Sequence, residues 1–487
     1  MADDKMQFRS EYIAAGIVLG ILCCILFFRP ITGVADNGDF ARIMNSTGLQ
    51  YITDSKSDRY FGFVNRLYKT GFIIPFGGGY FSTELPIVLL AVFISKLLLN
   101  AGLFDIRFLG AIYTLFFTAA VFLAVRCVRK RSGFSGAVAA IALILVFCDT
   151  GYISYFNSLY GEPVSSVFLL LLAASALLLA SSGKPALWTL LLFGISAVIF
   201  AGAKIQNSPA GILAALLLLR AVRLRKDIMW KRVSVLLAVF VVAVSALCYT
   251  GVSEDIKVCN KYQTVFYGIL RGSPDSERDL GELGLDPSLT VLAGTNYFME
   301  EYPVDIRTPE FKEMLSAKVN HIKVLSFYSR HPLRLLRKLE YAADNGFKLN
   351  QGVGNFEKYP GIEYKQVTKA FSFWGSFKQN VLPHSLLFLA AIYLAALLAV
   401  IYEYIRNRGK TACFFAEFAG FILLTGLMQF MLPIIGDGDA DLSKHLYLFN
   451  VSFDLLLVTG LTYISAKIAA AVRYVRERRL TAKLQAE

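Results

Sequence analysis

The residues best suited to chemistry begin with two aspartates and an arginine that follow the first long apolar run. Asp36, Asp39 and Arg42 lie within residues 35–42. Because they are spaced three residues apart, they would share one face of a short helix. Arg42 would keep Asp39 ionised by Coulomb attraction, and an ionised carboxylate in a cleft can act as a general base. The structural alternative is a helix cap with a surface ion pair, since Asp-Asn-Gly is also a turn sequence.

A second candidate is the polar, aromatic segment 154–163, in which Glu162 precedes the next apolar run. Tyr155 and Tyr160 would suit an aromatic belt at the membrane surface, with Glu162 as a favourable charge at a helix N-terminus. The same residues would also suit a surface on which sugars stack. Tyr160 and Glu162 are therefore candidate substrate-binding residues.

A third candidate is the loop 436–445, in which Asp437, Asp439 and Asp441 alternate with small residues. The pattern resembles a divalent-cation loop, but it lacks the glutamate at the twelfth position of an EF-hand. The three aspartates are candidate ligands for Mg or Mn, and the sequence indicates no other cofactor. Lys444 and His445, which follow, are better suited to an anion such as a phosphate. The alternative is a solvated loop between two spans.

Isolated charges inside or between apolar runs form a fourth group. Lys204 lies between two such runs and has no acidic neighbour in sequence. It either snorkels to the membrane surface or supplies a cation for a substrate phosphate. Asp454 and Glu417 lie within apolar runs, where lone acids serve as site, proton-relay or packing residues. Asp454 falls in the outer half of its run and is the better placed of the two to join a site.

The composition indicates which elements must position these residues. The chain has 487 residues, of which 56% are hydrophobic and 17% charged, whereas soluble globular proteins carry about 25% charged residues. A disordered protein, a coiled coil and an ordinary cytosolic enzyme are thereby excluded, and an all-α polytopic membrane protein is predicted. The seven cysteines are scattered, mostly in apolar runs, so neither a disulfide framework nor a zinc site is predicted.

Apolar runs long enough to cross a hydrocarbon core number about ten. We predict spans at 12–28, 108–126, 134–150, 164–182, 186–202, 209–222, 233–250, 384–403, 411–433 and 446–470. A further apolar segment, 85–103, contains Lys96 and is interrupted by Asn100-Ala101-Gly102. It is either an additional span or a juxtamembrane helix on the outer surface.

The positive-inside rule distinguishes these two possibilities. Basic clusters occur at 126–131, 220–232, 406–410 and 473–479. All four are cytoplasmic only if 85–103 lies on the outer surface, so we predict a juxtamembrane helix there and cytoplasmic termini. The net charge of +13 is then explained by short inner loops beside anionic lipid, and no nucleic-acid partner is predicted.

This topology divides the chain into three parts and places every candidate loop outside. Residues 1–250 form an N-terminal transmembrane module whose outer loop, 29–107, carries the juxtamembrane helices. Residues 251–383 form a mainly α-helical extracytoplasmic domain, and residues 384–487 form C-terminal spans and a cytoplasmic tail. The sequence contains no GxGxxG, Walker or GxSxG motif. An outer site without nucleotide motifs indicates a lipid-linked activated substrate.

These motifs and their sidedness resemble the GT-C superfamily of integral membrane glycosyltransferases. Asp39-Phe40-Ala41-Arg42 is similar to the acidic first-loop motif of that family, although Phe40 stands where many relatives carry a second acid. Ser82-Thr83-Glu84-Leu85-Pro86 looks like the start of its juxtamembrane helix, and Glu162 occupies its second-loop acidic position. Together with Lys204-Ile205-Gln206-Asn207-Ser208-Pro209 and the loop 436–446, the motifs resemble bacterial glycan-biosynthesis hexosyltransferases of cell-surface polysaccharide clusters.

The resemblance implies an inverting transfer in a bacterial plasma membrane. A hexose would pass from a polyprenyl-phosphate donor to a glycan or lipid-linked glycan acceptor on the extracytoplasmic face, with Asp39 as general base and Asp36 as the alternative. The substrate-binding residues it implies are Arg42, Glu84, Tyr160, Glu162, Lys204, Gln206, Asn207, Lys444 and His445. The competing interpretations are a polysaccharide polymerase, and a flippase or transporter of lipid-linked glycans. A flippase predicts an inverted repeat and midplane gating residues, and the sequence displays neither.

Overall fold

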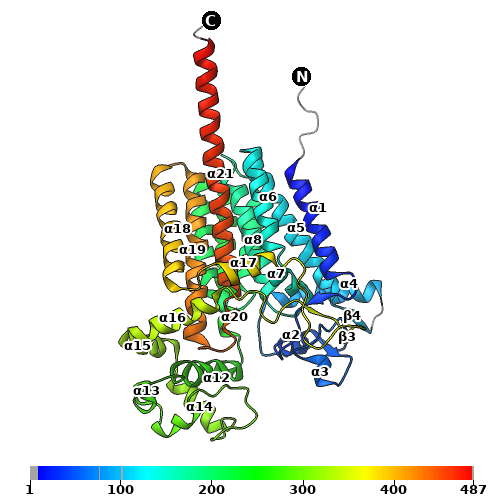
Figure 1. Cartoon of the computed structure of the whole chain (residues 1–487), viewed down its shortest axis with the longest axis vertical. Coiled ribbons are helices and arrows are strands. Elements are labelled where there is room, and N and C mark those ends of the chain that lie inside the picture. The colour runs from blue at the N-terminus through cyan, green and yellow to red at the C-terminus, as the bar shows by residue number, and fades with distance from the viewer. Residues whose placement is uncertain (1–8, 76, 100–101, 485–487) are drawn as a thin grey trace.

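Long parallel and antiparallel helices form one bundle in the computed structural model, which describes residues 9–75, 77–99 and 102–484 (Figure 1). Within these residues, seven helices are long and apolar enough to cross a membrane. They are α5 (Arg107–Arg129), α8 (Glu162–Ala180), α10 (Ser208–Ala221) with its flanking turns, α11 (Ile228–Thr250), α18 (Leu386–Arg406), α19 (Lys410–Gly436) and α21 (Tyr447–Leu484). The predicted all-α membrane fold is therefore confirmed.

The other three predicted spans are helices of a different kind. Two of them, α1 (Ser10–Leu26) and α9 (Leu187–Ala201), are apolar but have only 17 and 15 residues, fewer than the roughly 20 that cross a hydrocarbon core without thinning it. The third, α6 (Gly133–Phe147), is bent by 62° against the segment 150–157, which contains α7 (Thr150–Ile153) and η1 (Ser154–Asn157). This bend keeps the aromatic loop inside the bundle end.

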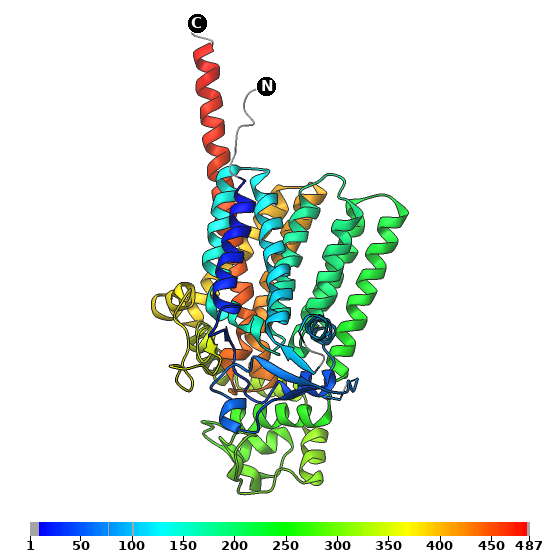
Figure 2. The same ribbon diagram turned by 90° about the vertical axis from the view of Figure 1, so that its right-hand side faces the viewer.

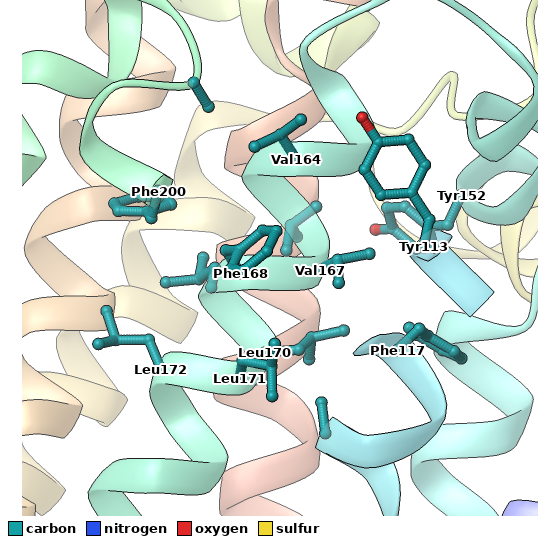
Figure 3. Packing of buried hydrophobic residues seen from close by; sticks show 14 of the residues in the cluster. Tyr113, Phe117, Tyr152, Val164, Val167, Phe168, Leu170, Leu171, Leu172 and Phe200 are labelled. Atoms are coloured by element: carbon teal, nitrogen blue, oxygen red, sulfur yellow. The ribbon is translucent and has the colours of Figure 1, made fainter. Parts of the chain in front are cut away.

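The central helix of the bundle is α8, the most deeply buried of the candidate spans. Its sequence is apolar on all sides, as expected for a helix surrounded by others. Figure 3 shows Phe168 of α8 between Phe200 of α9 and Phe117 of α5. Because α8 begins at Glu162, its burial holds that carboxylate rigidly at the end of the bundle.

The two ends of the bundle differ in the elements that they carry (Figure 1) and in the charge of their connecting loops. At one end α1 begins and α21 ends, and the connections there hold Arg129, Lys130, Arg225 and Arg406. We call this the basic end. The opposite end carries short strands, short helices and a helical domain, and we call it the site end. The first eight and last three residues, and with them the predicted positions of the termini themselves, lie outside the described residues.

The segment predicted as a juxtamembrane helix is α4 (Glu84–Leu98). It lies across the site end, and Figure 2 shows it nearly end-on while the bundle helices run vertically. Next to it lie α2 (Ala41–Thr47), α3 (Lys56–Arg59) and a three-stranded antiparallel sheet of β2 (Leu49–Tyr51), β3 (Leu67–Thr70) and β4 (Leu103–Asp105). Asn100 and Ala101, at the predicted break, lie outside the described residues.

A helical domain continues the site end away from the bundle (Figure 1). Its elements are α12 (Glu254–Tyr262), the π-helix η4 (Gln263–Ile269), α13 (Ser276–Leu283), η5 (Pro287–Leu292), α14 (Pro309–Lys318), α15 (His321–Arg330) and α16 (Pro332–Gly346). The helix α14 starts at Thr308-Pro309, where the Thr308 hydroxyl accepts a hydrogen bond from the Phe311 N–H. Its core, with Tyr262, Phe266 and Phe327, is continuous with side chains of α18, α19 and α21.

Residues 347–381, which we call the return segment, leave this domain and run back along the bundle. Within it, β5 (Asn355–Phe356) pairs with β1 (Thr32–Gly33), and α17 (Phe373–Val381) packs on α6. Glu357 forms ion pairs with Arg29 at 2.8 Å and Arg66 at 3.2 Å. The return segment thus ties the first loop to the bundle.

Candidate active site

Asp39 lies in the turn before α2 and faces two cations. Lys444 Nζ is 2.6 Å from its Oδ2 and Arg42 Nη2 is 3.0 Å from its Oδ1, so the ion pair expected from the spacing of three is present. Although burial opposes the charge, attraction from Lys444 and Arg42 lowers the pKa of Asp39 well below its ordinary value. Its side chain retains 31% exposure. Asp39 is therefore an ionised carboxylate that a second molecule can reach.

Asp36 points elsewhere, and the prediction that it shares one helical face with Asp39 is wrong. The two residues precede α2, and the buried Asp36 carboxylate turns back onto its own loop. It accepts hydrogen bonds from the N–H groups of Gly38 at 2.7 Å and Phe40 at 3.1 Å, and from the Tyr51 hydroxyl. Burial raises the pKa of Asp36. These contacts make Asp36 the residue that shapes the turn, which Gly38 completes with a φ of 107°.

Tyr160 joins the aromatic loop to this turn. Its hydroxyl accepts a hydrogen bond from the Asn37 N–H at 3.0 Å and lies 3.1 Å from the Ala35 carbonyl, to which it donates. Lys444 Nζ stands 4.1 Å from the centre of the Tyr160 ring, within range of a cation–π contact. Tyr155 and Tyr160 are buried and pack together, so they do not form the aromatic belt at a lipid surface that their sequence also allowed.

Glu162 and Lys204 form an ion pair of 2.6 Å next to Lys444. Lys204 is therefore not the unpaired cation that its sequence neighbours predicted. Only 1% of the Glu162 side chain is exposed. Burial opposes the charge of Lys444, but attraction from Asp39 and Glu162 together raises the pKa of Lys444. The charges at the site end consequently alternate, and three cations, Arg42, Lys444 and Lys204, face two ionised carboxylates.

Glu84, the first residue of α4, is the third carboxyl group of this cluster. It is buried, and its Oε1 has no hydrogen-bond partner within the described residues. Burial, reinforced by repulsion from Glu162, raises the pKa of Glu84 to about 8. Ser82 fixes its position, because the Ser82 hydroxyl donates to the Ala203 carbonyl at 2.7 Å and accepts from the Glu84 N–H. Glu84 is thus a neutral acid at pH 7.

The raised pKa of Glu84 predicts a specific pH dependence of stability. The folded protein holds a proton that the unfolded chain releases above its ordinary pKa of 4.5. The free energy of unfolding should therefore fall as pH rises from about 4.5 to about 8, by up to about 1.4 kcal/mol per pH unit. Glu84→Gln should remove this slope in thermal unfolding measured in detergent, and the exposed control Glu277→Gln should keep it. Equal slopes for both variants would contradict the assignment.

The loop 436–445 reaches the site through its last residues, while its aspartates diverge. His445 Nε2 is 2.8 Å from Asp437 Oδ2, Asp439 pairs with Lys338 at 2.7 Å, and Asp441 accepts from the Asn37 amide at 3.4 Å. Burial raises the pKa of Asp437. No group of three or more His, Cys, Asp or Glu side chains in the described part of the chain is arranged to hold a metal ion. The three aspartates therefore do not fit a common metal.

The two amides predicted next to Lys204 have different surroundings. The Gln206 Nε2 donates to the His445 carbonyl at 3.0 Å, which links the segment after α9 to the loop 436–445. Asn207 is buried, and its Nδ2 donates to the Ser165 hydroxyl at 2.8 Å and the Phe200 carbonyl at 2.9 Å. Gln206 therefore borders the cluster, whereas the Asn207 side chain is directed into the bundle and connects α8 with α9.

Two intramembrane acids considered in the sequence take no part in this cluster. Asp454 forms a fully buried pair with Lys378 of the return segment at 2.8 Å, and Glu417 pairs with Arg220 at 2.6 Å at the basic end. Sequence reasoning missed Tyr51, the partner of Asp36, and Tyr80, whose ring lies 6.0 Å from the Arg42 guanidinium. Neither residue stands in a motif, and only their place in the fold connects them with the carboxylates.

The chain as a whole matches one family model. Residues 3–484 match the family described as the YfdI N-terminal transmembrane domain. The protein belongs to this family. It is accordingly a multi-pass integral membrane protein, in agreement with the helices that span the bundle. No curated protein matches the sequence.

Solved structures similar to this YfdI-family chain come from an archaeal enzyme. One is the oligosaccharyltransferase AglB from Archaeoglobus fulgidus in complex with an inhibitory peptide and a dolichol-phosphate, which is 13% identical in sequence and has a TM-score of 0.39. The match covers 98% of this chain and 51% of the AglB chain. The Archaeoglobus fulgidus oligosaccharyltransferase in complex with Zn and sulfate is 13% identical with a TM-score of 0.38, covering 96% and 51%. The chain thus spans about half the length of these enzymes.

Proposed function

We propose that the protein transfers a hexose from a polyprenyl-phosphate donor to a cell-surface glycan acceptor, with inversion at the anomeric carbon. One observation carries this proposal: an accessible ionised carboxylate, Asp39, lies against Lys444 and Arg42 at the end of a membrane bundle. A base beside clustered cations suits a reaction in which a hydroxyl is deprotonated while a phosphate leaves. The resemblance of the first-loop motif to GT-C glycosyltransferases supports the same reaction class.

The charges at the two bundle ends support an extracytoplasmic site. The connections at the basic end are rich in Lys and Arg, and such loops stay in the cytoplasm. The site end then faces outward, where neither ATP nor nucleotide sugars are supplied. A sugar already activated by a lipid phosphate meets this constraint, and the resemblance implies the plasma membrane of a bacterium as the location.

In the proposed reaction the acceptor hydroxyl attacks the anomeric carbon of the donor. The bond from that carbon to the phosphate oxygen breaks, its electron pair goes to the phosphate, and the hydroxyl proton goes to Asp39. Asp39 is a weak base while Lys444 and Arg42 both stabilise its charge. A donor phosphate competes for these two cations. Its binding would therefore raise the pKa of Asp39 and make the carboxylate a stronger base when the substrate is in place.

The other clustered residues have positioning and binding roles in this proposal. Lys204 and Lys444 stabilise the departing phosphate, and preorganised charges of this kind are often the largest catalytic contribution. Glu162 keeps both lysines in place. Glu84, as a neutral acid, can donate a hydrogen bond to a sugar hydroxyl or to the phosphate. His445 and Gln206 border the cluster next to the helical domain, which would cover the site and select the acceptor.

A transfer assay tests the proposal directly. The purified protein, in detergent, is given a panel of polyprenyl-phosphate hexoses and a glycan acceptor, and the released polyprenyl phosphate is measured with and without a chelator. Turnover of at least one donor supports the proposal, and turnover that survives the chelator agrees with the divergent aspartates. If no donor reacts but the protein moves a labelled lipid-linked glycan across the membrane of liposomes, the proposal of a transferase is wrong and the protein is a flippase. Products that are joined lipid-linked glycans, without single-sugar transfer, would instead indicate a polymerase.

The control that Lys444 exerts on Asp39 predicts a shift in the pH profile. In Lys444→Gln the pKa of Asp39 rises, because the cation that lies 2.6 Å from its carboxylate and stabilises its charge is lost. The acid limb of kcat/KM should therefore move to higher pH, with a lower plateau from the weaker phosphate contact. Lys338→Gln is a matched control, since Lys338 pairs with Asp439 instead, and it should leave the acid limb in place. An unchanged acid limb in Lys444→Gln would contradict Asp39 as the base.

A further inference from the structure

A partly open apolar cavity of about 170 Å³ lies in the bundle, apart from the candidate active site. Its walls come from α5, α6, α8, α19 and α21 (Figure 1). Around α5 and α8 the lining residues, 120–131 and 170–181, lie towards the basic end, and so do residues 415–422 of α19. The helix α21 begins at the site end and contributes residues 455–466, which follow its first two turns. The cavity therefore opens at the depth of the membrane leaflet beside the basic end.

The lining of this cavity changes from polar to apolar along the membrane normal. Towards the basic end it includes Arg131, Ser135, Ser181 and Tyr463. Towards the middle of the bundle it consists of aliphatic and aromatic side chains, among them Leu170. A lipid with a charged head at the membrane surface and an alkyl tail at the midplane changes from polar to apolar in the same direction as this lining.

Two of these polar residues are available to a ligand. Ser135 is buried, and its hydroxyl has no hydrogen-bond partner within the described residues. Arg131 is exposed and donates to the Ala180 carbonyl at 3.1 Å. No carboxylate pairs with Arg131 in the part of the chain that the structure describes, whereas the neighbouring Arg129 is neutralised by Glu11 at 2.5 Å. The cavity mouth thus carries an uncompensated cation and an unused hydroxyl.

We propose that this cavity binds one alkyl chain of an anionic phospholipid from the leaflet at the basic end. The phosphate contacts Arg131, the Ser135 hydroxyl donates to a lipid ester or phosphate oxygen, and the chain lies along the apolar walls. A closed apolar cavity of about 150 Å³ admits one benzene-sized molecule, so the volume here holds a short stretch of one chain. The proposal does not depend on the transfer reaction at the site end.

Lipid retention tests this site. The full chain is reconstituted in vesicles of equal amounts of dioleoylphosphatidylglycerol and dioleoylphosphatidylethanolamine, extracted, and examined by native mass spectrometry. The wild type should keep one lipid and prefer phosphatidylglycerol about fivefold. This preference corresponds to the attraction of about 1 kcal/mol that one arginine exerts on an anionic lipid. Ala419→Phe, which fills the cavity, should lose this lipid, and the milder Ala139→Leu should lower its occupancy. Ala395→Phe on α18, outside the cavity, is the control and should retain it.

Three results would overturn the proposal. The first is equal retention by the wild type and by both filling variants, with folding verified by thermal unfolding. We expect Arg131→Gln to retain the lipid but to lose the preference for phosphatidylglycerol. The second contradicting result is therefore a wild type that retains lipid without any headgroup preference, or an Arg131→Gln variant that keeps the preference. The third is replacement of phosphatidylglycerol by an added polyprenyl phosphate, which would assign the cavity to the carrier lipid instead.

Discussion

Asp39→Asn should lower sugar transfer by 10²-fold or more. The amide cannot accept the proton of the acceptor hydroxyl, and general-base help is typically worth about 10²–10⁴-fold. The substitution also removes the charge that holds Lys444 at 2.6 Å. Donor phosphate should therefore bind at least as well as in the wild type, so the loss is expected in kcat and not in KM. Release of polyprenyl phosphate at saturating donor measures the first quantity, and donor titration measures the second.

The matched controls for this variant lie in the same loop. Asp54 pairs with Arg59 on the exterior and is fully exposed, so Asp54→Asn should keep wild-type turnover. Asp36→Asn should act through the shape of the turn, because Asp36 accepts hydrogen bonds from Gly38, Phe40 and Tyr51. It should lower the thermal stability together with activity, whereas Asp39→Asn should not. Full activity in Asp39→Asn with complete loss in a stable Asp36→Asn would transfer the role of base to Asp36.

Lys378→Met should destabilise the protein by about 3–5 kcal/mol, the usual cost of leaving one charge of a buried pair without its partner. Lys378 and Asp454 have no exposed side-chain surface. Lys378 Nζ contacts Asp454 Oδ2 at 2.8 Å and Asn450 Oδ1 at 2.7 Å, and the Trp374 indole donates to the same Asp454 oxygen at 2.8 Å. The pair joins the return segment to α21. Its loss should therefore also free residues 347–381, which hydrogen exchange would detect.

A double variant separates the charge from the packing. Lys378→Met with Asp454→Asn removes both charges and keeps an acceptor for Trp374, so it should regain most of the stability lost in Lys378→Met. Lys358→Met is the control within the return segment, because Lys358 forms an exposed pair with Asp58 at 2.9 Å and such pairs contribute about 1 kcal/mol or less. Chemical unfolding in mixed detergent measures all three. A double variant as unstable as Lys378→Met would show that the cost is not electrostatic.

The sequence by itself determined the helical membrane architecture and the first-loop ion pair. A long apolar run is a local property, and the hydrophobic effect converts it to a buried helix without regard to distant residues. The spacing of three between Asp39 and Arg42 is equally local, and the pair is present at 3.0 Å. The distribution of basic loops predicted that 85–103 does not cross the membrane, and α4 lies across the site end in agreement with this prediction.

Only the tertiary structure decided how the charges are paired. Lys444 and Asp39 are 405 positions apart, and Lys204 meets Glu162 across 42 positions. No local pattern predicts such pairs, because a buried charge is stabilised by whichever opposite charge the packed helices bring within reach. For the same reason Asp454, a site candidate in sequence, joins Lys378 instead. Hydropathy determines which segments are buried in the membrane, and the packing of those segments determines which carboxylate stays accessible for chemistry.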